Sequence, residues 1–227
     1  MKLKTQIAST TAPDGSQLVL FRHQDDYIIT VDRHDLMVSR AHESEHELAR
    51  LGCAHLTTHP SPKVLIGGLG MGYTLRQALD LLSPHATVVV AELLPEIVRW
   101  NREYLGNLNN HPLADARVAL QLDDVANVIH NSSGCFDAIL LDVDNGPEAI
   151  TDCRNNQLYT PEGIRASLRA LRPNGCLAIW SAFDDPDFER RLRRETAHVR
   201  CTPAAAYKGA KTRHCCIWTA VNAKGKP

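Results

Sequence analysis

The stretch KVLIGGLGMGYTLRQALDLL, residues 63–82, contains the pattern that decides the fold. It begins with a short, nearly continuous apolar run, as expected for a strand that is buried on both faces. Four glycines follow at positions 67, 68, 70 and 72, and residues 73–82 have the apolar spacing of an amphipathic helix. A strand, a glycine turn and a helix in this order are how a doubly wound sheet forms a crevice for a nucleotide.

The chain beyond residue 82 alternates between further apolar runs and helical patterns. The other strands are expected at residues 86–91, 117–121, 136–141, 176–181 and 213–221, and the helices at residues 95–105, 124–130, 161–171 and 186–195. Alternation of this kind is typical of a mostly parallel sheet with helices on both faces. The sequence therefore predicts an α/β fold with a doubly wound, Rossmann-like sheet.

The segment before residue 63 has a different pattern. Residues 17–32 hold two β-branched runs separated by HQDD, which predicts a β-hairpin. Residues 43–56 have leucines at helical spacing in a charged background, and two prolines then interrupt the chain. We therefore expect two domains, a small N-terminal β-hairpin and helix extension over residues 1–60 and a nucleoside-binding domain over residues 61–227.

The composition narrows the cellular setting. A formal net charge of −1 gives the chain no general attraction to nucleic acid or anionic membranes. No apolar run approaches the ~18 residues that indicate a membrane-spanning helix, and the N-terminus lacks the apolar segment of a signal peptide. Seven cysteines, an odd number with no C-x-x-C pair, indicate reduced thiols. We therefore expect a cytoplasmic protein without nucleic-acid or membrane partners.

The spacing of the glycines distinguishes between ligands. The dinucleotide-binding fingerprint G-x-G-x-x-G/A fails here because its last position, counted from Gly68, is Tyr73. The G-x-G-x-G pattern that is present is usual in S-adenosylmethionine enzymes, whose ligand carries no pyrophosphate. We therefore expect a nucleoside of this type to bind at the four glycines, which are Gly67, Gly68, Gly70 and Gly72. The alternative is a tight turn that only packs a helix on a strand.

Acidic residues follow the next two predicted strands. Glu92 ends the second strand, where a carboxylate can accept hydrogen bonds from both ribose hydroxyls; a solvated strand-end acid is the alternative. Asp123 and Asp124 follow the third strand, and we favour Asp124 as the acceptor for the adenine amino group. A helix N-cap is an equally consistent role for Asp124.

The fourth predicted strand runs into Asp142-Val143-Asp144-Asn145-Gly146-Pro147. This segment brings two carboxylates and an amide into the same crevice, because the carboxyl ends of parallel strands meet at one edge of the sheet. Two acids this close repel each other, which raises the pKa of one of them. Such a pair suits the binding and deprotonation of an amine; a capped loop with solvated acids is the alternative.

Taken together and in order, several segments between residues 14 and 221 resemble the spermidine synthase family. The matching segments are THPSPKVLIGGLGMG, VVVAELLPEIVRWNREYL, FDAILLDVDNGPEA and LYTPEGIRASLRALRPNGCLAIWS. The family's glycine motif runs G-G-G-D-G-G, and its catalytic loop runs D-x-x-D-P-x-G-P and is followed by an L-Y/F segment. The resemblance implies the fold of class I S-adenosylmethionine methyltransferases for the catalytic domain. Relatives of this kind often dimerise through the N-terminal region, so a homodimer is a further expectation.

The resemblance also implies roles for single residues. Glu92 corresponds to the residue that holds the ribose and Asp124 to the one that holds the adenine. Asp142 corresponds to the first acid of the catalytic loop. Asp144, after a one-residue gap, corresponds to the second acid, which orients and deprotonates the acceptor amine. Tyr159 corresponds to the aromatic residue that follows the loop.

Two departures from the family pattern bear on donor and acceptor. Gly70 stands where the family has the aspartate that faces the donor's primary ammonium, and Glu45-His46-Glu47 stands where the family has Tyr-His-Glu. The donor is therefore expected to be either S-adenosylmethionine or its decarboxylated form. Asn145 in the loop and Trp180 at the end of a core strand are further candidates for binding the acceptor, although Trp180 suits core packing equally well.

These observations predict a transferase that moves an aminopropyl or methyl group from a sulfonium donor to a small amine. The amine attacks the sulfonium carbon in line, so that catalysis consists mostly of placing the three reacting atoms, without a metal. Asp144 is expected to act as counter-charge and base, with Asp142 positioning the amine. Two alternatives stay open: a methyltransferase of unknown substrate and a non-catalytic nucleoside-binding homologue.

A zinc hydrolase is the alternative from another class. His42-Glu43-Ser44-Glu45-His46 matches H-E-x-x-H, which on a helix places two imidazoles on one face for zinc. The longer form of the motif requires a glycine and a further histidine where this chain has Ala49 and Gly52. The motif also lies outside the nucleotide-binding core, so we expect no metal.

Overall fold

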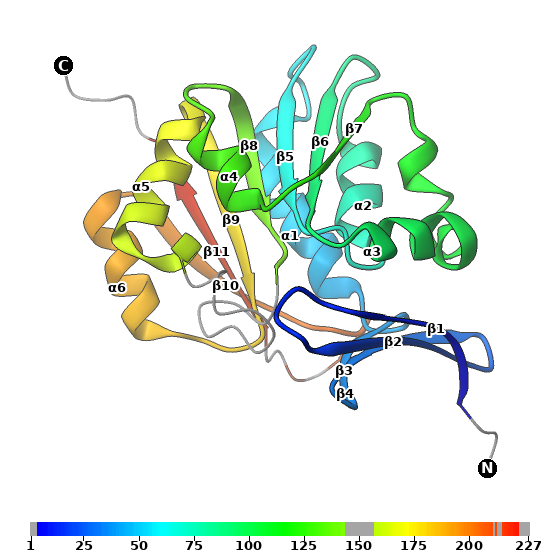
Figure 1. Cartoon of the computed structure of the whole chain (residues 1–227). Coiled ribbons are helices and arrows are strands. Elements are labelled where there is room, and N and C mark those ends of the chain that lie inside the picture. The colour runs from blue at the N-terminus through cyan, green and yellow to red at the C-terminus, as the bar shows by residue number, and fades with distance from the viewer. Residues whose placement is uncertain (1–3, 144–156, 211, 213–214, 223–227) are drawn as a thin grey trace.

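The protein consists of two β-sheets with helices around the larger one. The computed structural model describes residues 4–143, 157–210, 212 and 215–222. These residues form a four-stranded sheet in the order β1-β2-β3-β4 and a seven-stranded sheet in the order β10-β11-β9-β8-β5-β6-β7. Figure 1 shows the small sheet lying beneath the large one.

The seven-stranded sheet has the doubly wound topology expected from the sequence. Its strands are β5 (Lys63–Gly67), β6 (Thr87–Glu92), β7 (Val118–Leu122), β8 (Phe136–Leu141), β9 (Leu171–Ser181), β10 (Val199–Ala204) and β11 (Cys215–Val221). The five strands β5 to β9 run parallel to one another, and β11 pairs antiparallel with both β9 and β10. The chain passes from β5 to β6 on one side and later adds β8 on the other. The boundary between β5 and β8 is therefore the switch point at which such sheets bind ligands.

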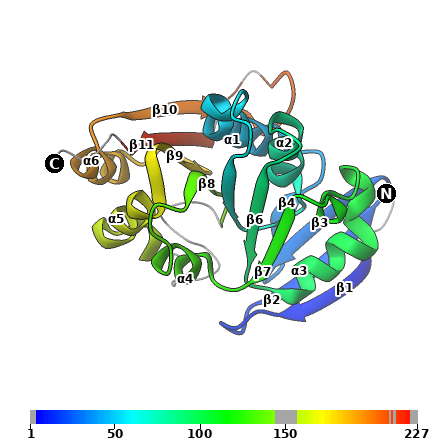
Figure 2. The same ribbon diagram turned by 90° about the horizontal axis from the view of Figure 1, so that it is seen from above.

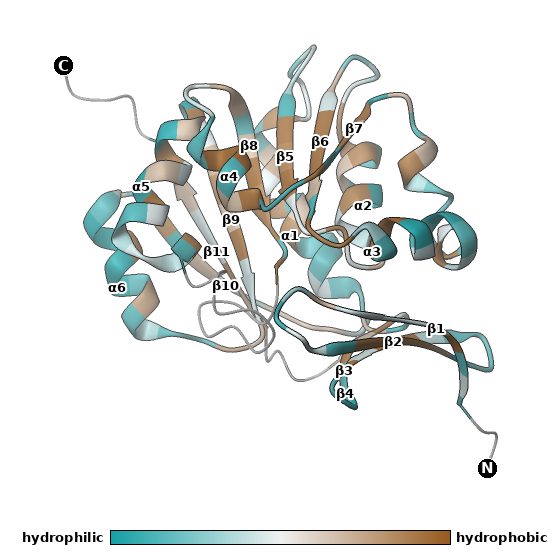
Figure 3. Ribbon diagram, in the orientation of Figure 1, coloured by the Kyte–Doolittle hydropathy of each residue, from teal (hydrophilic) through white to brown (hydrophobic). Residues whose placement is uncertain are grey.

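Helices cover both faces of this sheet, as the view from above in Figure 2 shows. They are α1 (Glu43–Cys53), α2 (Tyr73–Leu81), α3 (Pro95–Trp100), α4 (Val125–His130), α5 (Pro161–Ala170) and α6 (Pro186–Glu195). Helices α1 to α3 contribute to one hydrophobic core and α4 to α6 to the other. Val64 and Ile66 of β5 enter the first core and Leu65 the second. Burial on both faces explains why these strands are continuous apolar runs, which are brown in Figure 3.

The small sheet is antiparallel throughout. It consists of β1 (Thr5–Thr11), β2 (Gln17–His23), β3 (Asp26–Val31) and β4 (His34–Val38). The predicted hairpin corresponds to β2 and β3, whereas the sequence patterns did not predict β1 and β4. Leu20 and Ile29 of this sheet share a hydrophobic core with Leu48 of α1. Because α1 packs against α2, β8 and β9, the two parts of the chain share one core, and their division into domains stays a prediction.

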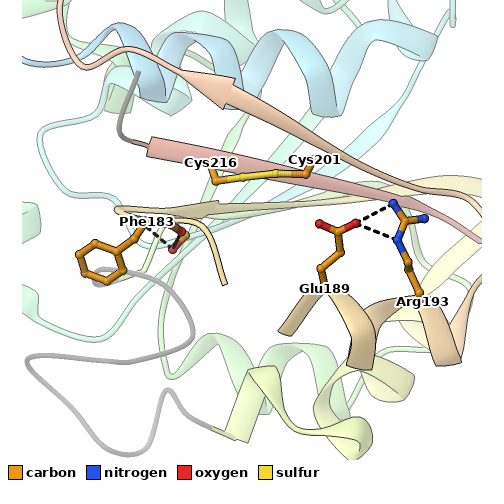
Figure 4. The surroundings of a disulfide bond; sticks show 6 residues. Phe183, Glu189, Arg193, Cys201 and Cys216 are labelled. Carbon is orange, nitrogen blue, oxygen red and sulfur yellow. Dashed lines mark hydrogen bonds and ion pairs between the residues drawn. A yellow bond between two sulfur atoms is a disulfide. The ribbon is translucent and has the colours of Figure 1, made fainter. Parts of the chain in front are cut away.

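A disulfide joins the two antiparallel strands at the edge of the large sheet. Cys201 of β10 and Cys216 of β11 are bonded, with their Cα atoms 6.4 Å apart (Figure 4). The expectation of reduced thiols is therefore wrong for this pair. The register aligns Cys201 with Trp218, so the two cysteines are diagonal neighbours across the strands, a proximity that spacing along the chain does not indicate.

The length and composition of the helices decide whether any of them could cross a membrane. None of the helices in the described part of the chain combines the length and the apolar composition that crossing a bilayer requires.

Candidate functional site

The glycine turn is tied to the end of β8 by the backbone. Gly68 has a φ of +84°, and a Cβ at this position would lie 2.4 Å from the carbonyl oxygen of Asp142. The amide of Asp142 donates to the carbonyl of Gly67 over 2.9 Å, and the amide of Gly68 donates to the carbonyl of Ala91 over 2.9 Å. Glycine is thus required at position 68 by the contact between two chain segments as well as by the left-handed backbone.

Two buried asparagines support the turn from behind. Asn101 Nδ2 donates to the carbonyl of Gly70 over 2.8 Å, and Asn109 Nδ2 donates to the carbonyl of Met71 over 2.9 Å. Both side chains are buried. They hold the left-handed turn in one conformation, and the sequence patterns gave no reason to single them out.

Glu92 lies where the sequence predicted it, at the end of β6 beside the turn. Its carboxylate accepts the Leu69 amide at Oε2 over 2.9 Å and the Leu94 amide at Oε1 over 2.8 Å. These bonds fix the side chain between the turn that follows β5 and the turn that follows β6. Each carboxylate oxygen can accept more than one hydrogen bond, so this arrangement is compatible with the predicted role of Glu92 toward ribose hydroxyls.

A cleft of about 130 Å³ lies between the carboxyl ends of the parallel strands and the small sheet. From the large sheet its lining includes Gly68, Gly70, Glu92, Asp123, Asp124 and Asp142. From the small sheet and its first turn the lining includes Asp14, Ser16, Leu18, Ile29 and Met37. The cleft thus brings together most of the predicted nucleoside-binding residues. The contribution of the small sheet is a feature that sequence reasoning missed.

The two acids after β7 line the cleft and also accept hydrogen bonds from residues at the start of α4. Asp124 is the N-cap of α4, and its Oδ1 accepts the Ala126 amide over 2.8 Å. Asp123 Oδ1 accepts the Asp124 amide over 2.7 Å and the Asn127 side-chain amide over 2.9 Å. The N-cap alternative is therefore observed for Asp124, and its contact with adenine stays a prediction.

A second, smaller cavity of about 30 Å³ adjoins the cleft and is lined by two carboxylates. One is Asp142, whose Oδ2 accepts the Thr74 hydroxyl over 2.5 Å. The other is Glu45 of α1, whose Oε2 accepts the Ser44 hydroxyl over 2.6 Å. Burial raises the pKa of Asp142 to about 6. Burial, and secondly the charge of Asp142, raise the pKa of Glu45 to about 8.

The wall of this cavity beside α1 is built from aromatic rings. Tyr73 lines the cavity, and its hydroxyl donates to the carbonyl of Ser39 over 2.8 Å. The ring of His42 stacks on Tyr73 with a centroid distance of 4.3 Å. Burial raises the pKa of Tyr73 above its ordinary value, with a smaller contribution from Glu45. Tyr73 is therefore a neutral wall and hydrogen-bonded support at this end of the site.

The remaining predicted residues lie in other places. Asp144 and Asn145 lie outside the described residues. Tyr159 is buried, its hydroxyl donates to the carbonyl of Val143 over 3.4 Å, and its ring packs edge-on against Phe188. Trp180 of β9 packs against the core on the α1 face. Neither aromatic residue is part of the lining described for the two cavities, and their contact with substrate stays a prediction.

The H-E-x-x-H segment straddles the start of α1. The rings of His42 and His46 lie 4.9 Å apart, and His42 Nδ1 donates to the carbonyl of Ser39 over 2.7 Å. Within the described ranges, the group of three neighbouring acidic or sulfur side chains is Asp184, Cys201 and Cys216, and its two cysteines are bonded to each other. This group contains neither histidine, so a third zinc ligand for them is not found in that part of the chain.

Two curated relatives from different organisms carry the same enzymatic name. The chain is 34% identical over 125 residues to the polyamine aminopropyltransferase of Nitrosomonas europaea, which covers 54% of this chain and 36% of the relative. It is 31% identical over 103 residues to the polyamine aminopropyltransferase of Saccharolobus islandicus, which covers 45% of this chain and 33% of the relative. The matched part thus spans about a third of the length of these relatives.

Solved structures share the fold. A spermidine synthase from Thermotoga maritima superposes with a TM-score of 0.74 at 19% identity, over 97% of this chain and 73% of that chain. A probable spermidine synthase from Corynebacterium glutamicum superposes with a TM-score of 0.68 at 19% identity, over 100% of this chain and 82% of that chain. A family model described as the spermine/spermidine synthase domain matches residues 45–215, which include the glycine turn, Glu92 and Asp142. The chain belongs to the spermine/spermidine synthase family.

Proposed function

We propose that this protein transfers an aminopropyl group from decarboxylated S-adenosylmethionine to a small amine. The observation that carries the proposal is the position of Asp142. This carboxylate lines both the nucleoside cleft and the smaller cavity, at the switch point of a chain that belongs to the spermine/spermidine synthase family. The names of the curated relatives support an acceptor of the polyamine type.

The cleft suits the adenosine part of such a donor. Glu92 is held by two backbone amides at one side of the glycine turn, where ribose hydroxyls can donate to it. Leu18 and Ile29 supply apolar surface from the small sheet, and Asp124 lines the cleft at the N-terminus of α4. In this arrangement the sulfur end of the ligand points toward Gly70 and Asp142.

The reaction needs an uncharged amine and correct placement. The amine nitrogen attacks the aminopropyl carbon bound to the sulfonium. A carbon–nitrogen bond forms as the carbon–sulfur bond breaks, and methylthioadenosine leaves with the bond's electron pair. A free alkyl amine has a pKa near ~10.4, so a carboxylate must first hold the ammonium and then accept its proton. We assign the base to Asp144 and the positioning of the amine to Asp142, with Tyr159, Asn145 and Trp180 as further candidates for acceptor contacts.

A product assay tests the proposal. The protein is incubated with candidate polyamines and, in parallel reactions, with decarboxylated S-adenosylmethionine or S-adenosylmethionine, and the products are identified by mass spectrometry. We expect methylthioadenosine and an aminopropylated amine from the decarboxylated donor. A methylated amine with S-adenosylhomocysteine, or binding without any product, would overturn the proposal in favour of a methyltransferase or a non-catalytic homologue.

The base is tested by a single substitution. Asp144→Asn should reduce turnover by roughly a thousandfold, as expected for loss of a general base, while methylthioadenosine affinity changes less than about twofold. Turnover equal to that of the wild type would refute the assignment of Asp144.

A further inference from the structure

The small cavity is an extension of the nucleoside cleft. The two share Met37, Gly70 and Asp142 in their linings. A ligand whose nucleoside lies in the cleft can therefore extend a short chain into the small cavity. The groups that line this extension decide which chain it accepts.

The charge of this extension comes from two carboxylates of distant segments. Asp142 follows β8, and Glu45 lies in the first turn of α1. No arginine or lysine in the described part of the chain forms an ion pair with either side chain. The arginine of the same helix, Arg50, pairs instead with Glu43 and Glu47.

The hydrogen bonds to these carboxylates leave acceptor capacity unused. Thr74 donates to one oxygen of Asp142, and Ser44 donates to one oxygen of Glu45. Both carboxylates line the cavity, and a carboxylate oxygen can accept more than one hydrogen bond. Two neighbouring carboxylates in a mostly enclosed cavity are costly unless a proton or a cation offsets their charge. In the ligand-free protein a proton can offset this charge, and a cationic group on a bound ligand can take the place of that proton.

The glycine turn itself adds no charge here. Gly70 has a φ of +51°, and a Cβ at this position would lie 3.2 Å from both the sulfur and the terminal methyl of Met37. The thioether of Met37 thus fills the space that a side chain at position 70 would enter. The cavity beside Gly70 is instead lined by an acid from a different element, Glu45 of α1.

We propose that Glu45, acting together with Asp142, binds the primary ammonium of the sulfonium donor and selects the decarboxylated donor over S-adenosylmethionine. S-adenosylmethionine carries an additional carboxylate next to its ammonium, and this carboxylate would face Glu45 and Asp142 at close range. Like charges in a site of low dielectric repel strongly. The inference rests on the proposed function, because it assumes that a nucleoside occupies the cleft.

Calorimetric titration of the full chain tests the inference with three ligands: decarboxylated S-adenosylmethionine, S-adenosylmethionine and methylthioadenosine. For Glu45→Gln we expect the affinity for the decarboxylated donor to fall at least about tenfold, as for loss of a charge-assisted hydrogen bond. The affinity for methylthioadenosine, which has no ammonium, should stay within about twofold. Glu47→Gln is the matched control on the same helix, because Glu47 pairs with Arg50 and is absent from the described lining of both cavities.

The three ligands distinguish a failure of the proposed function from a failure of the proposed role of Glu45. Methylthioadenosine that binds neither the wild type nor the variant contradicts the proposed function and the inference with it. Methylthioadenosine that binds both proteins equally, together with an unchanged preference between the two donors in Glu45→Gln, contradicts the inference alone. Retained methylthioadenosine binding in the variant also shows that the variant is folded.

Discussion

Replacing Glu45 by glutamine should stabilise the ligand-free protein at alkaline pH more than at acidic pH. The pKa of Glu45 is raised from 4.5 to about 8 by burial and by the neighbouring Asp142. The folded state therefore binds the Glu45 proton more tightly than the unfolded state. A group of this kind contributes stability that is complete below pH 4.5 and is lost as the pH rises toward 8. Glutamine has nearly the same shape but does not titrate, so the variant does not lose this contribution.

The size of the effect follows from the pKa difference. A difference of one pKa unit corresponds to about 1.4 kcal/mol, so the full difference between 4.5 and about 8 corresponds to about 5 kcal/mol. Asp142 also has a raised pKa and interacts electrostatically with Glu45, so the two carboxyl groups titrate together and the full difference does not belong to Glu45 alone. We therefore expect the stability of Glu45→Gln relative to wild type to rise by about 2 to 3 kcal/mol between about pH 5 and about pH 8.5.

Urea unfolding at both pH values measures this difference directly. The neighbouring ionisable side chains, which are His42, Glu43, His46 and Tyr73, are present in both proteins, so their direct contributions largely cancel in the comparison. Glu47→Gln serves as the control for removing a charge from α1, and its stability relative to wild type should change little with pH. A stability difference for Glu45→Gln that is the same at both pH values would refute the raised pKa of Glu45.

Three further perturbations test the rest of the site and the fold. Gly68→Ala should lower the free energy of unfolding by about 2 kcal/mol or more, because the new Cβ meets the Asp142 carbonyl at 2.4 Å. In Gly134→Ala the backbone is also left-handed but nothing lies within 4 Å, so an equal loss in both variants would argue against the contact. Thr74→Val should raise the pKa of Asp142, because the hydrogen bond from the Thr74 hydroxyl lowers that pKa. The acid limb of the pH profile of kcat/KM should therefore shift to higher pH. An acid limb that does not move would show that Asp142 does not determine it. Cys201→Ser should cost about 2 to 3 kcal/mol in oxidising buffer, whereas wild type and variant should be equally stable after reduction; equal stability without reductant would contradict a stabilising disulfide.

The patterns in the sequence predicted the centre of the large sheet closely. Strands β5, β6 and β8 are buried on both faces, so their apolar runs are continuous and stand out from the helices between them. Strand β10 was missed for the opposite reason. It lies at the edge of the sheet, is half exposed and contains Pro203, and none of these features gives an apolar run. Only the tertiary pairing with β11 makes this segment a strand.

The residues of the candidate site also differ in whether the sequence could predict them. Glu92, Asp124 and Asp142 could be predicted because acids at the carboxyl ends of parallel strands must meet at one edge of the sheet. The approach of Glu45 and Met37 to Gly70 could not be predicted, because it depends on how α1 and the small sheet pack against the core. The signal that pointed to Glu45 was its position where the family has tyrosine, and its meaning emerged only from the cavity that it shares with Asp142.

A crystal structure of the protein soaked with methylthioadenosine tests the central claim most directly. We expect the ribose hydroxyls to donate to Glu92, the adenine to lie beside Asp124, and the sulfur to point toward Gly70 and the cavity of Glu45 and Asp142. An empty cleft, or a nucleoside bound elsewhere on the molecule, would contradict the assignment of this cleft as the nucleoside-binding site.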